Sequence, residues 1–167
     1  VREAGRVKKK GDTILKDENG EALREPGKLK HVKGIGWYIE EYGVAQVSMN
    51  LTNITETPLH LAFEECCNSA SARGLRVTGS ELVGLVPKNV LTDAGRYFLQ
   101  KQGRSAGVSE EELIFIAIKT FGLNELSSFD PKKRIIEYML EDANTNVLIN
   151  QTLSQFADST ASDSPAP

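Results

Sequence analysis

GIGWYIEEYGVAQVSMNLTN, from Gly34 to Asn53, is the stretch that decides the fold of this chain. Apolar residues alternate with glycines and polar residues on both sides of a break at Glu41–Gly43. Successive side chains of a strand point to opposite faces of a sheet, so such alternation is typical of half-exposed strands. The stretch predicts two strands, roughly Leu29–Glu40 and Val44–Leu51, joined by a tight turn.

The composition limits the architecture and the partners. The chain has 167 residues, 40% of them hydrophobic, which is enough for one core and argues against a second full domain. A net charge of −3 and a pI near 5.5 provide no general basic field, so no nucleic-acid partner is expected. No apolar run approaches membrane-spanning length, so no membrane partner is expected either.

The two cysteines, Cys66 and Cys67, are adjacent in the sequence. Adjacent residues form neither a disulfide framework nor a spaced metal clamp, so we expect reduced thiols, a cytoplasmic location and no bound metal.

Helices and strands alternate in an order that indicates an α+β fold. Val1–Lys10 resembles the end of a helix, and Asp12–Glu25 resembles a polar hairpin turning at Asn19-Gly20. A further strand is predicted at Leu75–Val86. Four helices are predicted: one from Thr57-Pro58, capped by Thr57, to Gly74, then Lys88–Gln102, Ser109–Phe121 and Asp130–Leu140. This is the order of a split βαβ sandwich without its first strand, with helices on one face of a mixed or antiparallel sheet.

The sequence changes character after Leu140. Residues 141–167 are polar, then weakly amphipathic, then rich in Ser, Ala and Pro. We expect a linker followed by the opening of another element, and a flexible tail is the alternative. The chain begins at Val1 within charged, helix-like sequence and resembles a piece of something longer.

The two central strands predict a sheet with one covered and one open face. The covered face would pack under the helices and carry Ile35, Trp37, Ile39, Val47, Met49 and Leu51. The open face would carry Gly34, Gly36, Tyr38, Gln46, Ser48 and Asn50. With the turn at Glu41–Gly43, Gly36 would lie opposite Ser48, and Gly34 opposite Asn50.

Two glycines in one strand need an explanation, because glycine weakens a strand. A bulge or twist is as good an explanation as the close approach of a ligand. The neighbouring amides and hydroxyl favour a ligand, since they offer uncharged donors and acceptors that suit a flat polar heterocycle. We therefore interpret the open face as a binding surface.

Other candidate residues give weaker signals. Basic residues crowd the first fifth of the chain, which usually makes a solvated face and less often an anion site; they include Arg2, Arg6, Lys28, Lys30 and Lys33. His60 is expected to be solvated, His31 to lie at a strand edge, and Glu81 to face either solvent or a buried partner. No pair has nucleophile–base spacing, so no catalytic residue is assigned.

Four separated segments carry a resemblance to a known family. They are KLKHVKGIGWYIEEYGVAQVSMNLTN, TPLHLAFEE, RVTGSELVGLVPKNVL and FDPKKRIIEYML, and in this order they resemble the C-terminal half of the glutamate formiminotransferase domain. The resemblance covers residues 1–140, within which Asp12–Glu25 departs from the family pattern as an inserted hairpin. LINQTLSQFADSTASDSPAP is similar to the linker and first helix of the cyclodeaminase domain in bifunctional members, so residues 141–167 are interpreted as that junction.

The resemblance implies a ferredoxin-like fold and transfer of a formimino group between N-formiminoglutamate and tetrahydrofolate in histidine degradation. It also implies a folate site between two half-domains and a large homo-oligomer. The catalytic histidine of the family lies in the N-terminal half, and neither His31 nor His60 matches its motif. We therefore expect this chain to bind folate, with its polyglutamate tail near Arg2, Arg6, Lys28, Lys30 and Lys33, and to depend on the other half for the base.

Two other functions agree with the same residues. The chain can be a non-catalytic ferredoxin-like module that binds a small effector or pairs through its sheet, because fold alone does not decide function. It can also be a structural half whose open face is covered by a neighbouring domain.

Overall fold

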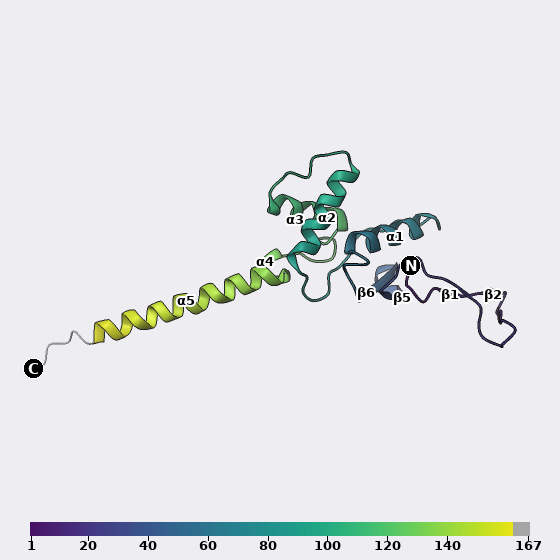
Figure 1. The fold of residues 1–167 in the computed structure, drawn as a ribbon, viewed down its shortest axis with the longest axis horizontal. Helices are drawn as coiled ribbons and strands as arrows, with labels where there is room; N and C mark the ends of the chain where they lie inside the picture. Colours follow the sequence, from purple (N-terminus) through teal and green to yellow (C-terminus); the bar gives the residue numbers. More distant parts are fainter. Residues whose placement is uncertain (162–167) are drawn as a thin grey trace, which may run out of the picture.

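The computed structural model describes the backbone of residues 1–161 and the side chains of residues 1–149 and 151. It has an α+β architecture (Figure 1). Three small antiparallel sheets pair β1 (Arg6–Val7) with β4 (Arg24–Glu25), β2 (Lys9–Lys10) with β3 (Thr13–Ile14), and β5 (Val32–Ile39) with β6 (Val44–Leu51). The helices are α1 (Leu59–Ser71), α2 (Lys88–Lys101), α3 (Glu110–Phe121), α4 (Pro131–Arg134) and α5 (Ile136–Ala161).

The hairpin β5–β6 confirms the two predicted central strands but not their register. Gly36 pairs with Val47 and Gly34 with Met49, one residue away from the predicted partners. The cause is the turn, in which Glu40 leaves the strand and joins a 3₁₀ turn, η1 (Glu40–Tyr42), that Gly43 closes at φ 61°. Because the side-chain period of a strand is two, this slip exchanges the faces of the two strands relative to each other.

The hydrophobic core lies among the helices. It is formed mainly by α2 and α3, with Val86, Leu123 and Ile135 completing it. Phe121 is its centre, with the ring of Phe63 from α1 edge-on at 5.1 Å and that of Phe98 at 5.4 Å. The predicted helices Lys88–Gln102 and Ser109–Phe121 are confirmed as α2 and α3. The cap predicted for the second is present, since the Ser109 hydroxyl accepts the backbone N–H of Glu112 at 3.2 Å.

The strand predicted at Leu75–Val86 is wrong. This segment has no strand and forms only one parallel bridge, between Val86 and Ile135. Its polar groups turn instead to the end of α3, where the Ser80 hydroxyl donates to the Phe121 carbonyl at 2.6 Å. Gly84 takes a φ of 85°, which interrupts an extended run, and Val83 is 86% exposed.

The N-terminal segment is extended, so the helix predicted at Val1–Lys10 is wrong. Gly5 and Gly11 both have φ 61°, a conformation that no α-helix contains. The turn predicted at Asn19-Gly20 is confirmed, with Gly20 at φ 83° and the Asp17 carboxylate accepting the N–H of Asn19 at 2.9 Å. In Figure 1 this part reaches away from the helices.

Two predicted helix boundaries also need correction. Pro58, not Thr57, is the residue before α1, and the Thr57 hydroxyl donates to the Lys30 carbonyl at 2.7 Å, which ties α1 to the start of the hairpin. The helix predicted at Asp130–Leu140 is broken at Ile135, whose ψ of 123° separates α4 from α5. α5 then continues past residue 140, where the domain boundary stays a prediction, and residues 162–167 lie outside the described residues.

Within residues 1–161, no helix combines the length and the apolar character needed to span a bilayer.

Replacing Gly95 with alanine should destabilise the chain. A Cβ at Gly95 would lie 2.2 Å from the Leu113 carbonyl oxygen, where α2 crosses α3. Alanine improves helix propensity by about 1 kcal/mol, but overpacking costs about 1–3 kcal/mol. Urea unfolding followed by circular dichroism should therefore show a lower free energy of unfolding. Gln100→Ala, at an exposed position of the same helix, is the control, and a stabilised Gly95→Ala would contradict the close crossing.

Candidate binding surface on the hairpin

The observed register gathers polar and aromatic side chains on one face of the hairpin. Trp37 pairs with Gln46, Ile35 with Ser48, and Lys33 with Asn50. We call these six residues the amide face. Directly paired residues of an antiparallel sheet project to the same side with their Cβ atoms about 4.5–5.5 Å apart. The face therefore places an indole beside an amide, with a hydroxyl, a second amide and a cation along the same strands.

The amide face is open. Trp37 is 44% exposed and Ile35 is 65% exposed, although both were predicted to lie under the helices. Two neighbouring exposed apolar side chains beside uncharged polar groups make this face a candidate surface for another molecule. The prediction missed Trp37 and Ile35 because it assumed a three-residue turn. Gly43 was the available signal, since glycine commonly closes a turn in the left-handed conformation.

The opposite face carries the two glycines with apolar neighbours. Gly34 and Gly36 share it with Val47, Met49 and the buried Val32. The predicted grouping of these glycines with Gln46, Ser48 and Asn50 is therefore wrong. Pairing runs through both glycines without a bulge, and an added Cβ at either would approach no atom closer than 3.4 Å. An added Cβ at either glycine would therefore make ordinary van der Waals contacts, so no close approach requires glycine at these positions.

A hollow of about 360 Å³ lies beside Gly34. Its lining includes Arg2, Lys33 and Gly34, three residues predicted from the sequence as binding residues. The Arg2 guanidinium donates to the Gly34 carbonyl at 3.1 Å through Nη1 and to the Gly5 carbonyl at 3.3 Å through Nε. The hollow thus joins the edge of β5 to two cationic side chains.

The remaining predicted cations differ in how far their charge is compensated. Lys28 forms an ion pair with Glu65 at 2.6 Å, and Arg6 forms one with Glu25 at 2.6 Å. Burial alone would raise the pKa of Glu65, but the hydrogen bonds from Lys28 and Ser69 outweigh it and lower that pKa. Among residues 1–149, no carboxylate pairs with Lys30 or Lys33, which are exposed. Arg2, Lys30 and Lys33 are therefore the predicted cations without an ion-pair partner among these residues, although Glu3 lines the same hollow as Arg2 and Lys33.

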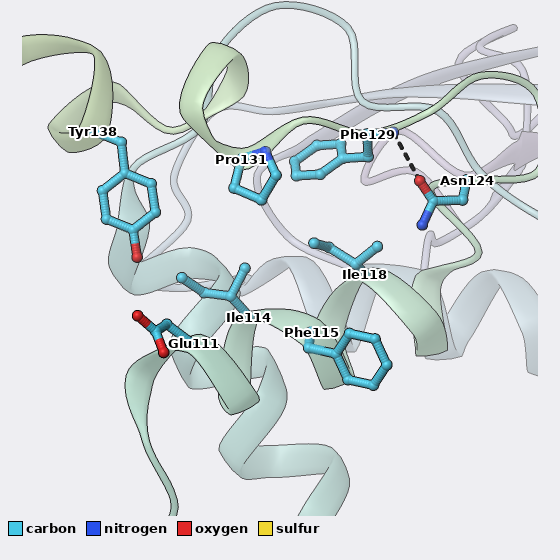
Figure 2. Close-up of a pocket in the computed structure, with 8 residues that line it drawn as sticks. All are labelled: Glu111, Ile114, Phe115, Ile118, Asn124, Phe129, Pro131 and Tyr138. Carbon is cyan, nitrogen blue, oxygen red and sulfur yellow. Dashed lines mark hydrogen bonds between the residues drawn. The ribbon is translucent and has the colours of Figure 1, made fainter. Parts of the chain in front are cut away.

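A second hollow, of about 320 Å³, lies between α3 and the start of α5 (Figure 2). Ile114, Phe115, Ile118 and Phe129 make it apolar. Its amide, that of Asn124, is occupied because Oδ1 accepts the backbone N–H of Phe129 at 2.7 Å. Since it has few polar groups to orient a ligand, it is a poorer candidate than the hairpin.

The titratable residues suggested by the sequence do not assemble a catalytic pair. Glu81 is exposed, and His31 lies just before β5 with its backbone N–H donating to Glu3 at 2.9 Å. Burial raises the pKa of both the Cys66 and Cys67 thiols, which disfavours the reactive thiolate. In the part of the chain with described side chains, no three His, Cys, Asp or Glu residues are grouped to hold a metal.

His60 is half-buried, which corrects its prediction as a solvated residue. Its ring stacks on Tyr97 with centroids 4.3 Å apart. The Tyr97 hydroxyl donates to Glu64 at 2.6 Å, and Lys101 forms an ion pair with the same carboxylate. This cluster joins α1 to α2 and lies outside the amide face.

These observations define an α+β module with an open hairpin face and a cationic edge. Residues 1–141 match the formiminotransferase domain family, and the chain belongs to that family. The chain is 43% identical over 152 residues to the formimidoyltransferase-cyclodeaminase of Dictyostelium discoideum, covering 90% of this chain and 28% of that protein. It is 42% identical over 151 residues to that of Gallus gallus, with the same coverage of 90% and 28%.

A relative with a shorter match has a narrower name. The glutamate formimidoyltransferase of Thermoplasma acidophilum is 38% identical over 81 residues, which are 48% of this chain and 27% of that protein. These matches confirm the family resemblance of the sequence. The first two matches also show that the chain spans little more than a quarter of the length of these formimidoyltransferase-cyclodeaminases.

Stability should decrease as His60 becomes protonated. Burial lowers its pKa in the folded chain below the usual 6.5, against the raising effect of Asp93 and Glu64. A group with a lowered folded-state pKa contributes stability above its unfolded pKa, and that contribution is lost as the pH falls through the folded pKa. Urea unfolding from pH 7.5 to 5 should show this loss, and His60→Gln should reduce it. His31→Gln is the matched control, and an unchanged pH profile in His60→Gln would contradict the assignment.

Proposed function

We propose that this chain is the folate-binding half of a glutamate formimidoyltransferase. The reaction transfers a formimino group between N-formiminoglutamate and tetrahydrofolate in histidine degradation, in the cytoplasm. Membership of the formiminotransferase domain family supports this proposal, together with the names of the relatives. The amide face is the observation that carries it, because its chemistry suits one ring system of tetrahydrofolate.

The pyrimidine ring of a tetrahydropterin is flat, polar and uncharged over most of its edge. The exposed indole of Trp37 provides a surface for stacking such a ring. Gln46 lies directly across from Trp37, and Ser48 and Asn50 follow on the same side of β6, so donors and acceptors line the edge of a stacked ring. Gly34 and Gly36 stay in the proposed site on the other face of β5, where Gly36 is exposed and the Gly34 carbonyl accepts the Arg2 guanidinium.

The glutamate tail of folate would continue toward the cationic edge. Arg2 and Lys33 line the hollow beside Gly34, and Lys30 lies shortly before β5 with its side chain exposed. Carboxylates of a polyglutamylated tail form charge-assisted hydrogen bonds with such groups. Lys28 and Arg6 stay in the proposed path, but each would have to exchange a carboxylate within this chain for one on the ligand.

We also propose that the N-terminal half, which would precede this segment in longer members of the family, completes a ferredoxin-like fold. Along β5, the Glu3 N–H donates to the Val32 carbonyl at 2.9 Å, and the Arg2 side chain reaches Gly34. From Gly36 to Ile39 no third strand is paired in residues 1–161, which leaves an edge where a further strand would add. The expected partners are the N-terminal half, a cyclodeaminase domain and further copies in a homo-oligomer.

The chemistry requires a proton to leave the attacking amine of tetrahydrofolate and reach the departing amine of glutamate. A carbon–nitrogen bond to the folate forms first and gives a tetrahedral intermediate, from which the bond to glutamate then breaks. A positioned base moves the proton, and hydrogen-bond donors stabilise the tetrahedral intermediate. We assign the base to the N-terminal half and the positioning of folate to this chain.

A non-catalytic module that binds a small effector or pairs through its sheet is the alternative. It is favoured by one observation: Glu3, the acidic residue that lines the hollow with Lys33, already has its carboxylate engaged by the backbone N–H of His31. Both proposals predict binding at the hairpin, so only activity distinguishes them.

Formimino transfer should appear only when this chain is combined with the upstream half. The assay uses N-formiminoglutamate and tetrahydrofolate, with each half alone and with the mixture. Activity in the mixture, reduced at least tenfold by Gln46→Ala with Asn50→Ala, is the expected result. Gln100→Ala, on α2, is the matched control. A silent mixture of folded, associated halves would leave the binding module as the better interpretation.

Trp37 should report folate binding directly, because it is the single tryptophan of the chain. Stacking of a pterin on the indole should quench its fluorescence in a saturable way when tetrahydrofolate is added to the combined halves, and Trp37→Phe should remove this part of the signal. Asn50→Ala should shift the titration to higher folate concentration without changing the free spectrum. Quenching that never saturates, or that is equal with N-formiminoglutamate alone, would count against the pterin site.

The cationic edge should matter more for long glutamate tails than for short ones. Replacing Lys30 and Lys33 with alanine should weaken polyglutamylated tetrahydrofolate roughly fivefold, since exposed ion pairs contribute about 0.2–1 kcal/mol each. The monoglutamate should lose less. Lys28→Ala with Lys30→Ala should act in the same direction, with a smaller part from Lys28 because Glu65 already compensates it. Equal losses for the two ligands in competition titrations would exclude this path.

A further inference from the structure

Three helices begin at one point of the fold. Lys88 is the first residue of α2, Glu110 is the first residue of α3, and Glu137 and Tyr138 lie in the first turn of α5. We call these four residues the helix joint. Figure 2 shows the phenol of Tyr138 extending from α5 toward the first turn of α3.

Glu110 is the common acceptor of the helix joint. One of its oxygens lies 3.1 Å from the Lys88 ammonium, and the other accepts the Tyr138 hydroxyl at 3.0 Å. The same ammonium lies 5.5 Å from the centre of the Tyr138 ring. Burial and the Glu110 hydrogen bond raise the pKa of Tyr138 to about 12, so the phenol stays a donor at physiological pH.

Glu137 caps a helix other than its own. The residue before α2 is Pro87, which offers no side-chain cap. The Glu137 carboxylate instead accepts the backbone N–H of Lys88 at 2.8 Å. The first N–H groups of a helix have no partner within it and attract negative charge, so α5 supplies what α2 lacks.

The backbone before α5 is held as firmly as its side chains. Ile135, between α4 and α5, is completely buried. Val86 donates its N–H to the Arg134 carbonyl at 2.9 Å and accepts the Ile136 N–H at 3.1 Å. The start of α5 is therefore attached to the segment that leads directly into α2.

Beyond the first turn of α5, its described side chains are exposed to solvent. Every side chain from Met139 to Ile149 is exposed, as is that of Gln151. Figure 1 shows α5 extending from the helices as a straight rod. The contacts of Glu137, Tyr138, Ile135 and Ile136 described above all lie at its start.

We propose that the helix joint fixes the direction of α5 and so makes it a rigid lever, with Glu110 and Tyr138 as its positioning residues. A 26-residue helix is about 39 Å long at a rise of 1.5 Å per residue. A change of direction of about 10° would move Ile149, about 20 Å along the helix, by about 3.5 Å. A domain attached to the end of α5 would thereby have a fixed position relative to α2 and α3. This inference does not depend on folate binding.

The test is a distance distribution in the intact chain. Spin labels attached to genetically encoded ketone residues at Gln100 on α2 and Asn146 on α5 leave both cysteines unchanged. Double electron–electron resonance should give one narrow distance in the otherwise unaltered chain. Glu110→Ala with Tyr138→Phe should shift or broaden it by about 3 Å or more.

Two controls separate direction from unfolding. Asp93→Asn removes an exposed ion pair within α2, to Arg96, and should leave the distribution unchanged. Circular dichroism should show that the double variant keeps its helices, and Tyr138→Phe alone provides a milder change if it does not. A broad distribution in the unaltered chain, or an unchanged one in a folded double variant or a folded Tyr138→Phe, would overturn the proposal.

Discussion

The register of one hairpin governs the functional interpretation of this chain. Glu40–Gly43 make a four-residue connection, and Gly43 closes it in the left-handed conformation. Moving one residue between strand and turn exchanges the side chains that share a face. The observed register places Trp37 across from Gln46, and it separates Gly34 and Gly36 from the polar residues of β6. An aromatic and amide surface results, in place of a glycine and amide surface.

The hairpin and the helical core have different roles in this fold. Phe121 and its aromatic neighbours stabilise the helices, whereas much of the hairpin stays exposed. The two parts are joined at the start of the hairpin, where the Lys30 carbonyl accepts the Thr57 hydroxyl and Lys28 pairs with Glu65. A ligand on the amide face would therefore contact strands that are attached to α1 near Lys28 and Lys30 and largely exposed beyond that point.

Local sequence patterns predicted the elements whose determinants are local. The period of α2, the Ser109 cap of α3 and the Asn19-Gly20 turn each depend on neighbouring residues, and all three appear in the structure. The strand expected at Leu75–Val86 failed because its backbone finds partners at the end of α3, far away in sequence. Trp37 was misplaced because an ambiguity of one residue in a turn reverses a face. The pairing of Glu110 with Lys88 and Tyr138 joins three helices and has no local signal.

In the proposed function, the exposed hairpin also affects how this chain would meet the N-terminal half. In residues 1–161 the sheet of β6 has two strands, so the outer edge of β6 is unpaired, and Val44 and Val47 are exposed along it. An unpaired edge of this kind pairs with whichever chain arrives first, including another copy of itself. Joining two halves through a short flexible segment raises their effective concentration to the millimolar range. Synthesis of both halves as one chain would therefore favour their pairing with each other over aggregation.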